Sequence, residues 1–368
     1  MNIALVVPGG VDRSGVYRVI PALLALIRRL AARHELHVFA LHQEPLPGEW
    51  ELCGARIHNI GARPRGLRAI REIRRVHRNA PFHVVQSIWS GGCGATAVTA
   101  ARLLRIPCVV HVAGGEMVAI ADIGYGGRQT WRGRVREALV LRMAAAVTTN
   151  SAPMVEALAQ LGIASRRVAL GVDLDAWPVR APQPRSANAP ARLLHVASLN
   201  RVKDQPTLLR AIAALVASGR EVRLDVVGDD TLHGAIEASA RDLGLGDVVT
   251  FHGFLPQQRL RPLVEAADLL LLASRHEAGP YVLLEAAVAG VPTVGTAVGQ
   301  LAEWAPQAAL AVAVGDSAAL AAAIDALLGD EARRLRIAVA AQRLALAEDA
   351  DYTARCFEQV YAALGLAH

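Results

Sequence analysis

The amino-acid sequence predicts an α/β protein with two doubly wound domains, and three observations lead to this expectation. Short apolar segments of strand length alternate with amphipathic segments of helical periodicity from residue 2 to residue 364. The chain has 368 residues, which is a length that accommodates two domains of ordinary size. Pro178, Pro182, Pro184 and Pro190 interrupt the alternation once, which is typical of a linker.

The first half of the chain contains six apolar runs that predict a parallel sheet covered by helices on both faces. The predicted strands are 2–7, 36–41, 55–59, 83–87, 107–112 and 145–149, and the predicted helices are 15–32, 67–79, 93–104, 133–143 and 152–161. We therefore expect an amino-terminal domain over residues 1–178 and a linker over residues 179–191.

The same alternation restarts after the linker and predicts a second domain over residues 192–349. Its predicted strands are 192–197, 222–227, 248–251, 268–272, 292–294 and 310–312, and its predicted helices are 204–217, 233–243, 257–266, 281–289, 300–304, 317–328 and 331–347. A last predicted helix covers residues 350–364. Parallel sheets of this kind bind ligands beyond the carboxyl ends of their strands, and clefts between domains are favoured sites.

Charge is distributed unevenly along the chain. Residues 1–180 hold 23 arginines and 12 acidic residues, a net charge of +11, whereas residues 181–368 hold 16 basic and 21 acidic residues, a net charge of −5. A basic first half indicates either an acidic partner, such as anionic lipid or a phosphate-linked molecule, or a solvated arginine-rich surface.

A segment within this basic half predicts an amphipathic helix. Seven arginines lie between residues 63 and 78, and Leu67, Ile70, Ile73 and Val76 form an apolar stripe between them. The stripe is expected to pack on the sheet, with the arginines either solvated or docked on an anionic membrane. Nucleic acid is not expected as a partner, because no aromatic stacking residues accompany these arginines.

The cysteines and histidines give no pattern of a metal or redox site. Cys53, Cys93, Cys108 and Cys356 are scattered and form no C-x-x-C pair. His34, His37 and His42 lie across a helix end and the following strand, so we expect packing roles for them and no metal. Unpaired thiols, a strand-like start at Met1 and no apolar run of about 18 residues lead us to expect a cytoplasmic protein.

One basic residue differs from all the others. Of the 39 lysines and arginines, only Lys203 is a lysine. A compact ammonium group is not interchangeable with a planar guanidinium group, so its retention in an arginine-rich chain indicates a function. Lys203 lies between the predicted strand 192–197 and the predicted helix 204–217.

The densest pattern follows the predicted strand 268–272, where residues 274–287 read S-R-H-E-A-G-P-Y-V-L-L-E-A-A. Gly279 makes a turn, and Tyr281 and Val282 open a helix whose backbone N–H groups form an anion site. Glu277 lies on the loop and Glu285 lies inside the helix. Carboxylates at these two places suit a diphosphate ligand that carries hydroxylated rings on both sides.

This pattern resembles the retaining glycosyltransferases of family 4, which have the GT-B fold. The E-x7-E pair and residues 290–294, which read G-V-P-T-V, are similar to the family pattern, although Ala278-Gly279-Pro280 replaces the usual Gly-Phe-Gly. The resemblance implies a GT-B fold with the nucleotide sugar on the second domain. It assigns Glu277 to the donor sugar, Glu285 to the ribose and Lys203 to the phosphates. It also implies that the closing segment, residues 350–368, packs back toward the first domain.

The same resemblance assigns further residues. His111 is placed beside the sugar, near the reaction centre. The family arginine position holds Ser198, and Arg201 is the nearest substitute. The other expected donor-binding residues are Gly10, Gly228, Phe254, Gly279, Tyr281, Val282, Thr296 and Gly299.

The resemblance therefore predicts a retaining hexosyltransferase, of the kind found in polysaccharide biosynthesis, that uses a UDP-, GDP- or ADP-sugar and no cofactor. Its acceptor is expected to be a glycan, a lipid-linked molecule or a small molecule, and peripheral contact with the inner face of a membrane is a further expectation. Two alternatives share the scaffold, namely a catalytically silent protein that binds nucleotide or polymer and a nucleotide-sugar epimerase. The combination of Glu277, Glu285 and Lys203 argues against the silent scaffold.

Overall fold

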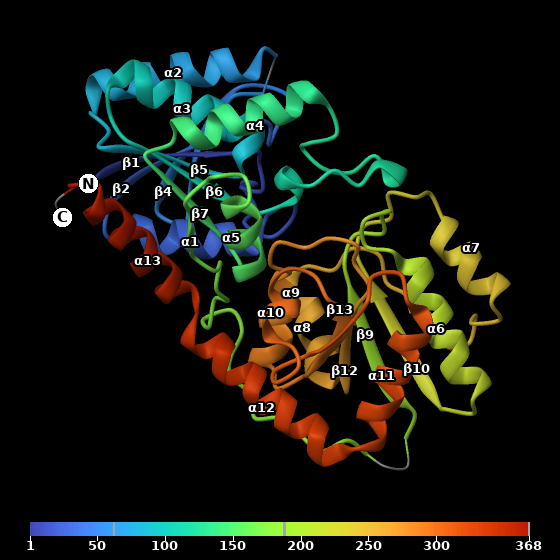
Figure 1. Cartoon of the computed structure of the whole chain (residues 1–368). Coiled ribbons are helices and arrows are strands. Elements are labelled where there is room, and N and C mark those ends of the chain that lie inside the picture. Colours follow the sequence, from blue (N-terminus) through green and yellow to red (C-terminus); the bar gives the residue numbers. More distant parts are fainter. Residues whose placement is uncertain (62, 187–188, 367–368) are drawn as a thin grey trace. The chain divides into compact units, whose positions relative to one another are not determined.

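The computed structural model describes residues 1–61, 63–186 and 189–366 and divides the chain into two compact α/β units (Figure 1). The first unit comprises Met1–Asp173 and Glu348–His368, and the second comprises Leu174–Ala347. Each unit contains one sheet with helices packed against it, so the expected fold class is confirmed.

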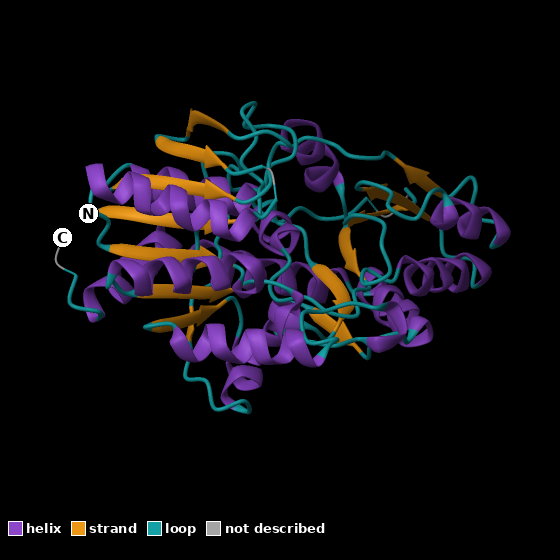
Figure 2. Ribbon diagram, turned by 90° about the horizontal axis from the view of Figure 1, so that it is seen from above, coloured by secondary structure: helices purple, strands orange, loops and turns teal. Residues whose placement is uncertain are grey.

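The first unit contains an eight-stranded sheet in the order β3-β4-β2-β1-β5-β6-β7-β8, whose strands lie side by side in Figure 2. Every neighbouring pair is parallel except β3 and β4, which are antiparallel. The strands are β1 (Asn2–Val7), β2 (Glu35–Ala40), β3 (Gly48–Leu52), β4 (Ala55–Asn59), β5 (Val84–Ile88), β6 (Cys108–Val112), β7 (Ala146–Thr149) and β8 (Arg166–Arg167).

Helices cover both faces of this sheet. They are α1 (Pro21–Ala31), α2 (Arg65–Asn79), α3 (Ala95–Leu104), α4 (Trp131–Met143), α5 (Ala152–Ala159) and α13 (Ala350–Ala363), with short helical turns η1 (Ser90–Gly94), η2 (Gly115–Met117) and η3 (Ala121–Ile123). In Figure 1, α2, α3 and α4 form one layer, and α1 and α13 lie against the other face. The buried side chains of Phe357 and Tyr361 on α13 join the apolar core of this unit.

The second unit contains a six-stranded, fully parallel sheet in the order β11-β10-β9-β12-β13-β14. Its strands are β9 (Ala191–Val196), β10 (Val222–Val227), β11 (Val249–Phe251), β12 (Leu269–Leu272), β13 (Thr293–Thr296) and β14 (Leu310–Val312). Its helices are α6 (Gln205–Ala217), α7 (Ala235–Asp242), α8 (Gln257–Ala266), α9 (Tyr281–Val288), α10 (Gly299–Trp304), α11 (Ser317–Gly329) and α12 (Glu331–Ala347). β9 and β12 are neighbours, so the loops that follow them meet at one edge of the sheet.

Three details differ from the expected elements. The predicted helix 15–32 begins at Pro21, because residues 10–20 form a closed loop in which the N–H of Ile20 donates to the carbonyl of Gly10 at 3.0 Å. A proline at the first helical position is well tolerated, so it marks the true start. The edge strands β3 and β8 were not expected, although the exposed Glu49 and Glu51 of β3 alternate with half-buried residues as in an edge strand. Leu67, expected in the apolar stripe of α2, is 59% exposed, whereas Ile73 and Val76 are buried.

The boundary between the units lies at Asp173 and Leu174, before the proline-rich segment. Trp177 is fully buried, and the N–H of Arg180 donates to the carbonyl of Val288 at 3.1 Å. Residues 174–178, expected in the first domain, therefore belong to the second unit. Among the helices that the structure describes, none is both long enough and apolar enough to cross a membrane.

Candidate functional site

The loops after β9 and β12 come together in the second unit and carry Lys203 and Glu277. The N–H of Arg275 donates to the carbonyl of Val202 at 2.7 Å, which ties one loop to the other. The Lys203 ammonium group forms an ion pair with Oε1 of Glu277, and the Ser274 hydroxyl donates to the same oxygen at 2.7 Å. The fold therefore joins two residues that are far apart in the sequence into one polar centre.

This centre is partly shielded from water. The side chains of Lys203 and Glu277 are 22% and 12% exposed. Charge interactions are stronger in such a setting than at an open surface, so the ammonium group can act on a ligand anion with little screening. The pairing also orients the Lys203 side chain before any ligand arrives.

The backbone around Lys203 is fixed by a tight turn. The side-chain oxygen of Asn200 accepts from the N–H groups of Val202 and Lys203 at 3.2 and 3.3 Å. Asp204 has a φ of 48° and caps α6 through its carboxylate, which accepts from the hydroxyl of Thr207 at 2.8 Å. The sharp turn at Asp204 directs Lys203 out of the helix that follows it.

A buried histidine lies beneath this centre. His195 donates through Nδ1 to the carbonyl of Leu271 at 2.8 Å, and its Nε2 lies 3.2 Å from the amide nitrogen of Gln205. Burial lowers the pKa of His195 to about 4, so the ring is neutral at physiological pH. Of His195 and Lys203, only Lys203 therefore supplies positive charge to the centre.

The amino terminus of α9 lies directly after the Glu277 loop. Its cap residue is Pro280, whose side chain makes no capping hydrogen bond, so the positive end of the α9 backbone dipole lies beside the Glu277 loop. Gly299, at the start of α10, has a φ of 51°, and a Cβ atom there would lie 2.4 Å from the carbonyl oxygen of Glu277. The hydroxyl of Thr296 donates to the carbonyl of Ser274 at 2.5 Å. Thr296 and Gly299 thus brace the loop that carries Glu277.

Glu285 is placed differently from Glu277. It is buried on α9, and Oε1 accepts from the side-chain amide of Gln257 on α8 at 2.9 Å. Burial raises the pKa of Glu285 to about 7, although the hydrogen bond from Gln257 opposes the shift. A ligand hydroxyl that binds this carboxylate would share it with Gln257. Gln257 was not found by sequence reasoning, because only the fold places α8 against α9.

The raised pKa of Glu285 predicts a pH-dependent stability. Glu285 has a higher pKa in the folded chain than in the unfolded one, so its contribution is fully present below about pH 4.5 and is lost as the pH rises through about 7. As the pH rises from about 5 to about 8, we expect the free energy of unfolding of Glu285→Gln to increase relative to that of the parent protein. Thermal unfolding of both proteins over this range measures the effect, and a constant difference would contradict it. Gln257→Leu removes the hydrogen bond that opposes the pKa shift of Glu285, so it should enlarge the pH dependence of the free energy of unfolding.

Three other predicted residues lie at neighbouring strand ends of the second unit. Gly228 has a φ of 150°, and a Cβ atom there would lie 2.0 Å from the carbonyl oxygen of Ala197. Its N–H donates to the carbonyl of Gly253 at 2.9 Å. Phe254 is 43% exposed, and Arg201 is exposed as well. Gly228 is therefore required by backbone packing, while Phe254 and Arg201 remain accessible to a ligand.

His111 does not lie at an accessible strand end. It is inside β6 and 0% exposed, with Nε2 2.8 Å from Oδ1 of Asn150 and Nδ1 2.9 Å from the hydroxyl of Thr148. Its ring packs edge-on against Phe357, with ring centroids 5.4 Å apart. Burial lowers its pKa to about 4. The expected contact of His111 with a sugar does not fit this geometry, because the strand continues past His111 and both ring nitrogens are used within the core.

A stability measurement tests this structural role. His111→Ala is expected to lower the free energy of unfolding by about 2–4 kcal/mol, because it leaves a cavity and two buried polar groups without their partner. Transfer by the remaining folded enzyme should be unchanged. A large loss of rate at an unchanged melting temperature would show that His111 acts in the reaction.

The glycine-rich loop after β1 is braced from within the first unit. Oε1 of Gln43 accepts from the N–H groups of Gly10 and Val11 at 2.7 and 3.0 Å. Gly10 has a φ of 80°, and a Cβ atom there would collide with Ile20. The N–H of Gly10, a residue expected to bind the donor, is therefore already bonded. Gln43 has no sequence signature, since it lies in the short polar run His42-Gln43-Glu44 after β2.

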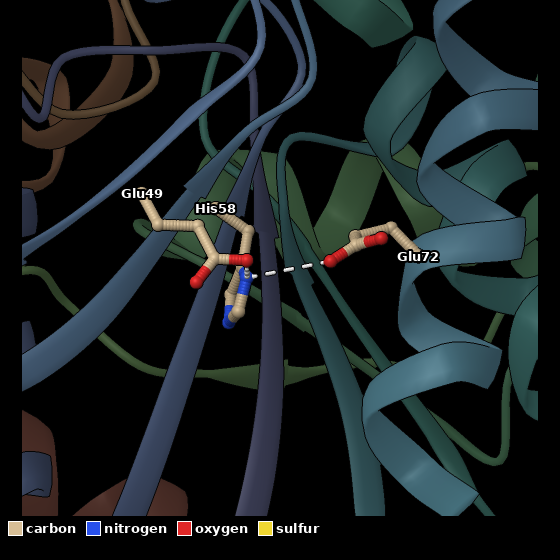
Figure 3. A group of neighbouring side chains, drawn as sticks. All are labelled: Glu49, His58 and Glu72. Carbon is tan, nitrogen blue, oxygen red and sulfur yellow. Dashed lines mark hydrogen bonds and ion pairs between the residues drawn. The ribbon is translucent and has the colours of Figure 1, made fainter.

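One cluster in the first unit has the composition of a metal site. Glu49 on β3, His58 on β4 and Glu72 on α2 place one ligand atom each within 4.8 Å of one another (Figure 3). The guanidinium of Arg75 bonds to both carboxylates, with Nη2 3.0 Å from Oε1 of Glu49. The hydrogen bond from Arg75 lowers the pKa of Glu72, and burial lowers that of His58. Because Arg75 already bonds to both carboxylates, we assign the cluster to holding the edge hairpin against α2.

Family models match both units. Residues 180–344 match the model described as glycosyl transferases group 1, and residues 19–172 match the one described as a glycosyl transferase 4-like domain. The chain is 33% identical over 234 residues to glycogen synthase of Mycobacterium tuberculosis, an alignment that covers 62% of this chain and 56% of that protein. It is 28% identical over 287 residues to 2-deoxystreptamine glucosyltransferase of Streptomyces kanamyceticus, covering 72% of this chain and 73% of that protein. The match thus spans little more than half of the glycogen synthase.

Solved structures share the fold over the full chain. Sucrose-phosphate synthase from Thermosynechococcus elongatus superposes with a TM-score of 0.83 at 20% identity, covering 100% of both chains. HepE from Anabaena, solved in complex with UDP-glucose, superposes with a TM-score of 0.76 at 19% identity, covering 99% of this chain and 100% of that one.

Proposed function

The chain belongs to the group 1 glycosyltransferases, with the GT-B fold, and from this premise we propose that it transfers a sugar from a nucleotide-diphosphate sugar to an acceptor with retention of configuration. The observation that carries the proposal is the Lys203–Glu277 centre beside the amino terminus of α9. A cation and a helix amino terminus at one place suit a diphosphate leaving group, and the carboxylate suits sugar hydroxyls.

In this proposal Lys203 acts on the leaving group. As the bond between the sugar and the diphosphate breaks, negative charge grows on the phosphate oxygens, and the ammonium group and the dipole of α9 stabilise it. Because these groups supply the positive potential, the proposal includes no metal or other cofactor.

Glu277 is proposed to orient the donor sugar rather than to attack it. Its Oε1 already accepts from Lys203 and Ser274, and this engagement weakens it as a nucleophile. With no carboxylate assigned as the nucleophile, retention follows from attack of the acceptor on the face that the diphosphate leaves, through an oxocarbenium-like state.

The donor base and the acceptor are proposed from similarity and charge. HepE was solved with UDP-glucose, so a UDP-sugar is the first donor to test before GDP- and ADP-sugars. The basic first unit supports an acceptor that carries negative charge, such as a lipid-linked or polymeric glycan. The similarity to 2-deoxystreptamine glucosyltransferase supports a small molecule as an alternative. We propose a reducing, cytoplasmic location, which the four unpaired cysteines support.

Donor binding and donor chemistry together test this function. A thermal-shift series with UDP, GDP, ADP and their sugars is expected to raise the melting temperature with one base, since a ligand that binds the folded state stabilises it. Slow release of nucleoside diphosphate from that donor should then be measurable. Binding without release would indicate a silent scaffold, and NMR detection of an inverted sugar centre would indicate an epimerase. No stabilisation by any nucleotide would refute the proposal.

A further inference from the structure

Helix α4 presents an apolar stripe to solvent in the middle of a basic surface. Trp131, Val135 and Leu139 follow one another at four-residue spacing, and they are 63%, 48% and 54% exposed. This spacing places all three on one side of the helix. Large side chains in such an arrangement usually mark an interaction surface, because an exposed apolar stripe of this kind is unfavourable in water.

The orientation of α4 is fixed, so the stripe cannot turn inward. Gly133, Glu137, Val140 and Leu141 form the buried side of the helix. The carboxylate of Glu137 accepts from the hydroxyl of Ser90 at 2.6 Å in the interior. A Cβ atom on Gly133 would lie 2.2 Å from the carbonyl oxygen of Gly127, which shows how closely the helix start is packed.

Arginines flank the stripe on both sides. Arg132 and Arg136 lie on one side, Arg134 lies on the other, and Arg142 lies near the end of the stripe; all four are exposed. The guanidinium carbon of Arg132 lies 5.5 Å from the centroid of the Trp131 ring. Glu137 is the sole acidic residue of α4, and it is buried. The exposed face of α4 is therefore apolar in the centre and cationic at its edges.

Two hollows extend this face. An apolar groove of about 360 Å³ runs between α3 and α4 beside Trp131 and Leu139. On the opposite side of α4, a cavity of about 260 Å³ is lined by Arg128, Arg134 and Arg142 above an apolar floor that includes Met117 and Leu161. Apolar hollows and clustered guanidinium groups suit acyl chains and phosphates, respectively.

From this geometry we infer that α4 docks on an anionic membrane surface, with Trp131, Val135 and Leu139 entering the interface and the flanking arginines binding lipid phosphates. An apolar stripe flanked by cations is the composition of interfacial helices, and tryptophan favours the headgroup region. Neighbouring α2 in the same layer adds exposed arginines and strengthens the attraction without supplying an equal apolar stripe.

A second basic surface lies on α12 in the other unit and gives a comparison. Val339 and Leu344 are 46% and 40% exposed there, beside Arg336 and Arg343. That unit holds 16 basic and 18 acidic residues, a net charge of −2, whereas the unit that contains α4 holds 23 basic and 15 acidic residues, a net charge of +8. Charge complementarity to an anionic bilayer therefore favours α4 over α12.

The inference extends the proposed function, because it names the surface that would bring the protein to a lipid-linked acceptor. The binding of α4 to a membrane does not itself depend on sugar transfer. Vesicles of phosphatidylcholine, with and without phosphatidylglycerol, are the probe. The full chain is expected to sediment with the anionic vesicles, to remain in solution with the neutral ones, and to be released by high salt.

Two matched double variants locate the surface. Trp131→Ser with Leu139→Gln is expected to weaken vesicle binding about tenfold or more, and Val339→Gln with Leu344→Gln on α12 is expected to leave it unchanged. Release of nucleoside diphosphate from the donor, measured without vesicles, should be the same in all three proteins. If none of the three proteins released nucleoside diphosphate, the proposed function would be contradicted, and the inference about α4 would be unaffected.

Three outcomes would overturn the inference. The first is that the chain binds neutral and anionic vesicles equally. The second is that the α12 variant, and not the α4 variant, loses vesicle binding. The third is that the parent protein forms a stable dimer in solution and the substitutions on α4 dissociate it. The last result would show that a second copy of the chain covers α4. Circular dichroism of each variant establishes that the exposed substitutions leave the fold intact.

Discussion

Lys203→Ala is expected to lower the rate of sugar transfer by about 10²–10³-fold, because it removes the cation assigned to the departing diphosphate. The substitution also leaves Glu277 without its ion-pair partner, although Ser274 still donates to the same oxygen. Since both side chains of the ion pair are partly exposed to solvent, the melting temperature should change little. Steady-state kinetics with the donor identified by thermal shift measures the effect, and transfer at the parental rate would contradict the role of Lys203.

Two controls separate the charge from the geometry. Arg201→Ala removes an exposed cation of the same loop that the family resemblance assigns to donor binding, so it is expected to weaken donor binding but to lower the rate less than Lys203→Ala. Lys203→Arg keeps the charge but replaces a compact ammonium group by a planar guanidinium group, so it should retain only part of the parental rate. A double-mutant cycle with Glu277→Gln is expected to be non-additive, because the two side chains act as a pair. Additive losses would show that they act independently.

Gly299→Ala is expected to reduce donor binding strongly by displacing the loop that carries Glu277. A Cβ atom at Gly299 would lie 2.4 Å from the carbonyl oxygen of Glu277 and 2.9 Å from that of Ala278. Both neighbours are backbone atoms, so the loop itself must move. The φ of 51° adds strain of about 1–2 kcal/mol, and relief of the collision should cost about 1–3 kcal/mol more. Calorimetry with the nucleoside diphosphate and thermal unfolding measure the two effects.

Gly315 provides a matched control for this substitution. It has a φ of 80° in the same unit, but no atom lies within 4 Å of a Cβ placed there. Gly315→Ala should therefore introduce the conformational strain without displacing the loop that carries Glu277. We expect it to lower the stability and to leave the nucleotide affinity unchanged. Equal affinities of the two alanine variants would contradict the assignment of Gly299.

The local pattern of the chain was sufficient for most elements of both sheets. Buried parallel strands such as β1 and β12 are continuous apolar runs, and this signal does not depend on what surrounds them. The elements that were missed lack a continuous apolar run and form by backbone pairing between segments that are close in the chain. The loop before α1 is closed by the bond from Ile20 to Gly10, and the edge strand β3 forms only because β4 is available to pair with it.

The site residues divide in the same way. Lys203 and Glu277 were expected from residue type and position, and the fold brings them into contact. His111 was assigned to the reaction centre, but its side chain points into the core, where Thr148 and Asn150 bind it. Sequence position fixes where a residue lies along a strand only to within a residue or two, and that uncertainty decides whether its side chain reaches a ligand or the interior.

The sequence by itself determined the α/β class, the two successive sheets and the residues with distinctive chemistry, because periodicity and rare residue types are local properties. Tertiary structure alone decided which polar groups are already bonded. It placed Gln43 against the glycine-rich loop, Gln257 on Glu285 and Arg75 between two glutamates. It also left the stripe of α4 exposed, although its sequence resembles that of an ordinary covering helix. Burial and pairing depend on residues that are remote in the chain, so no local pattern contains them.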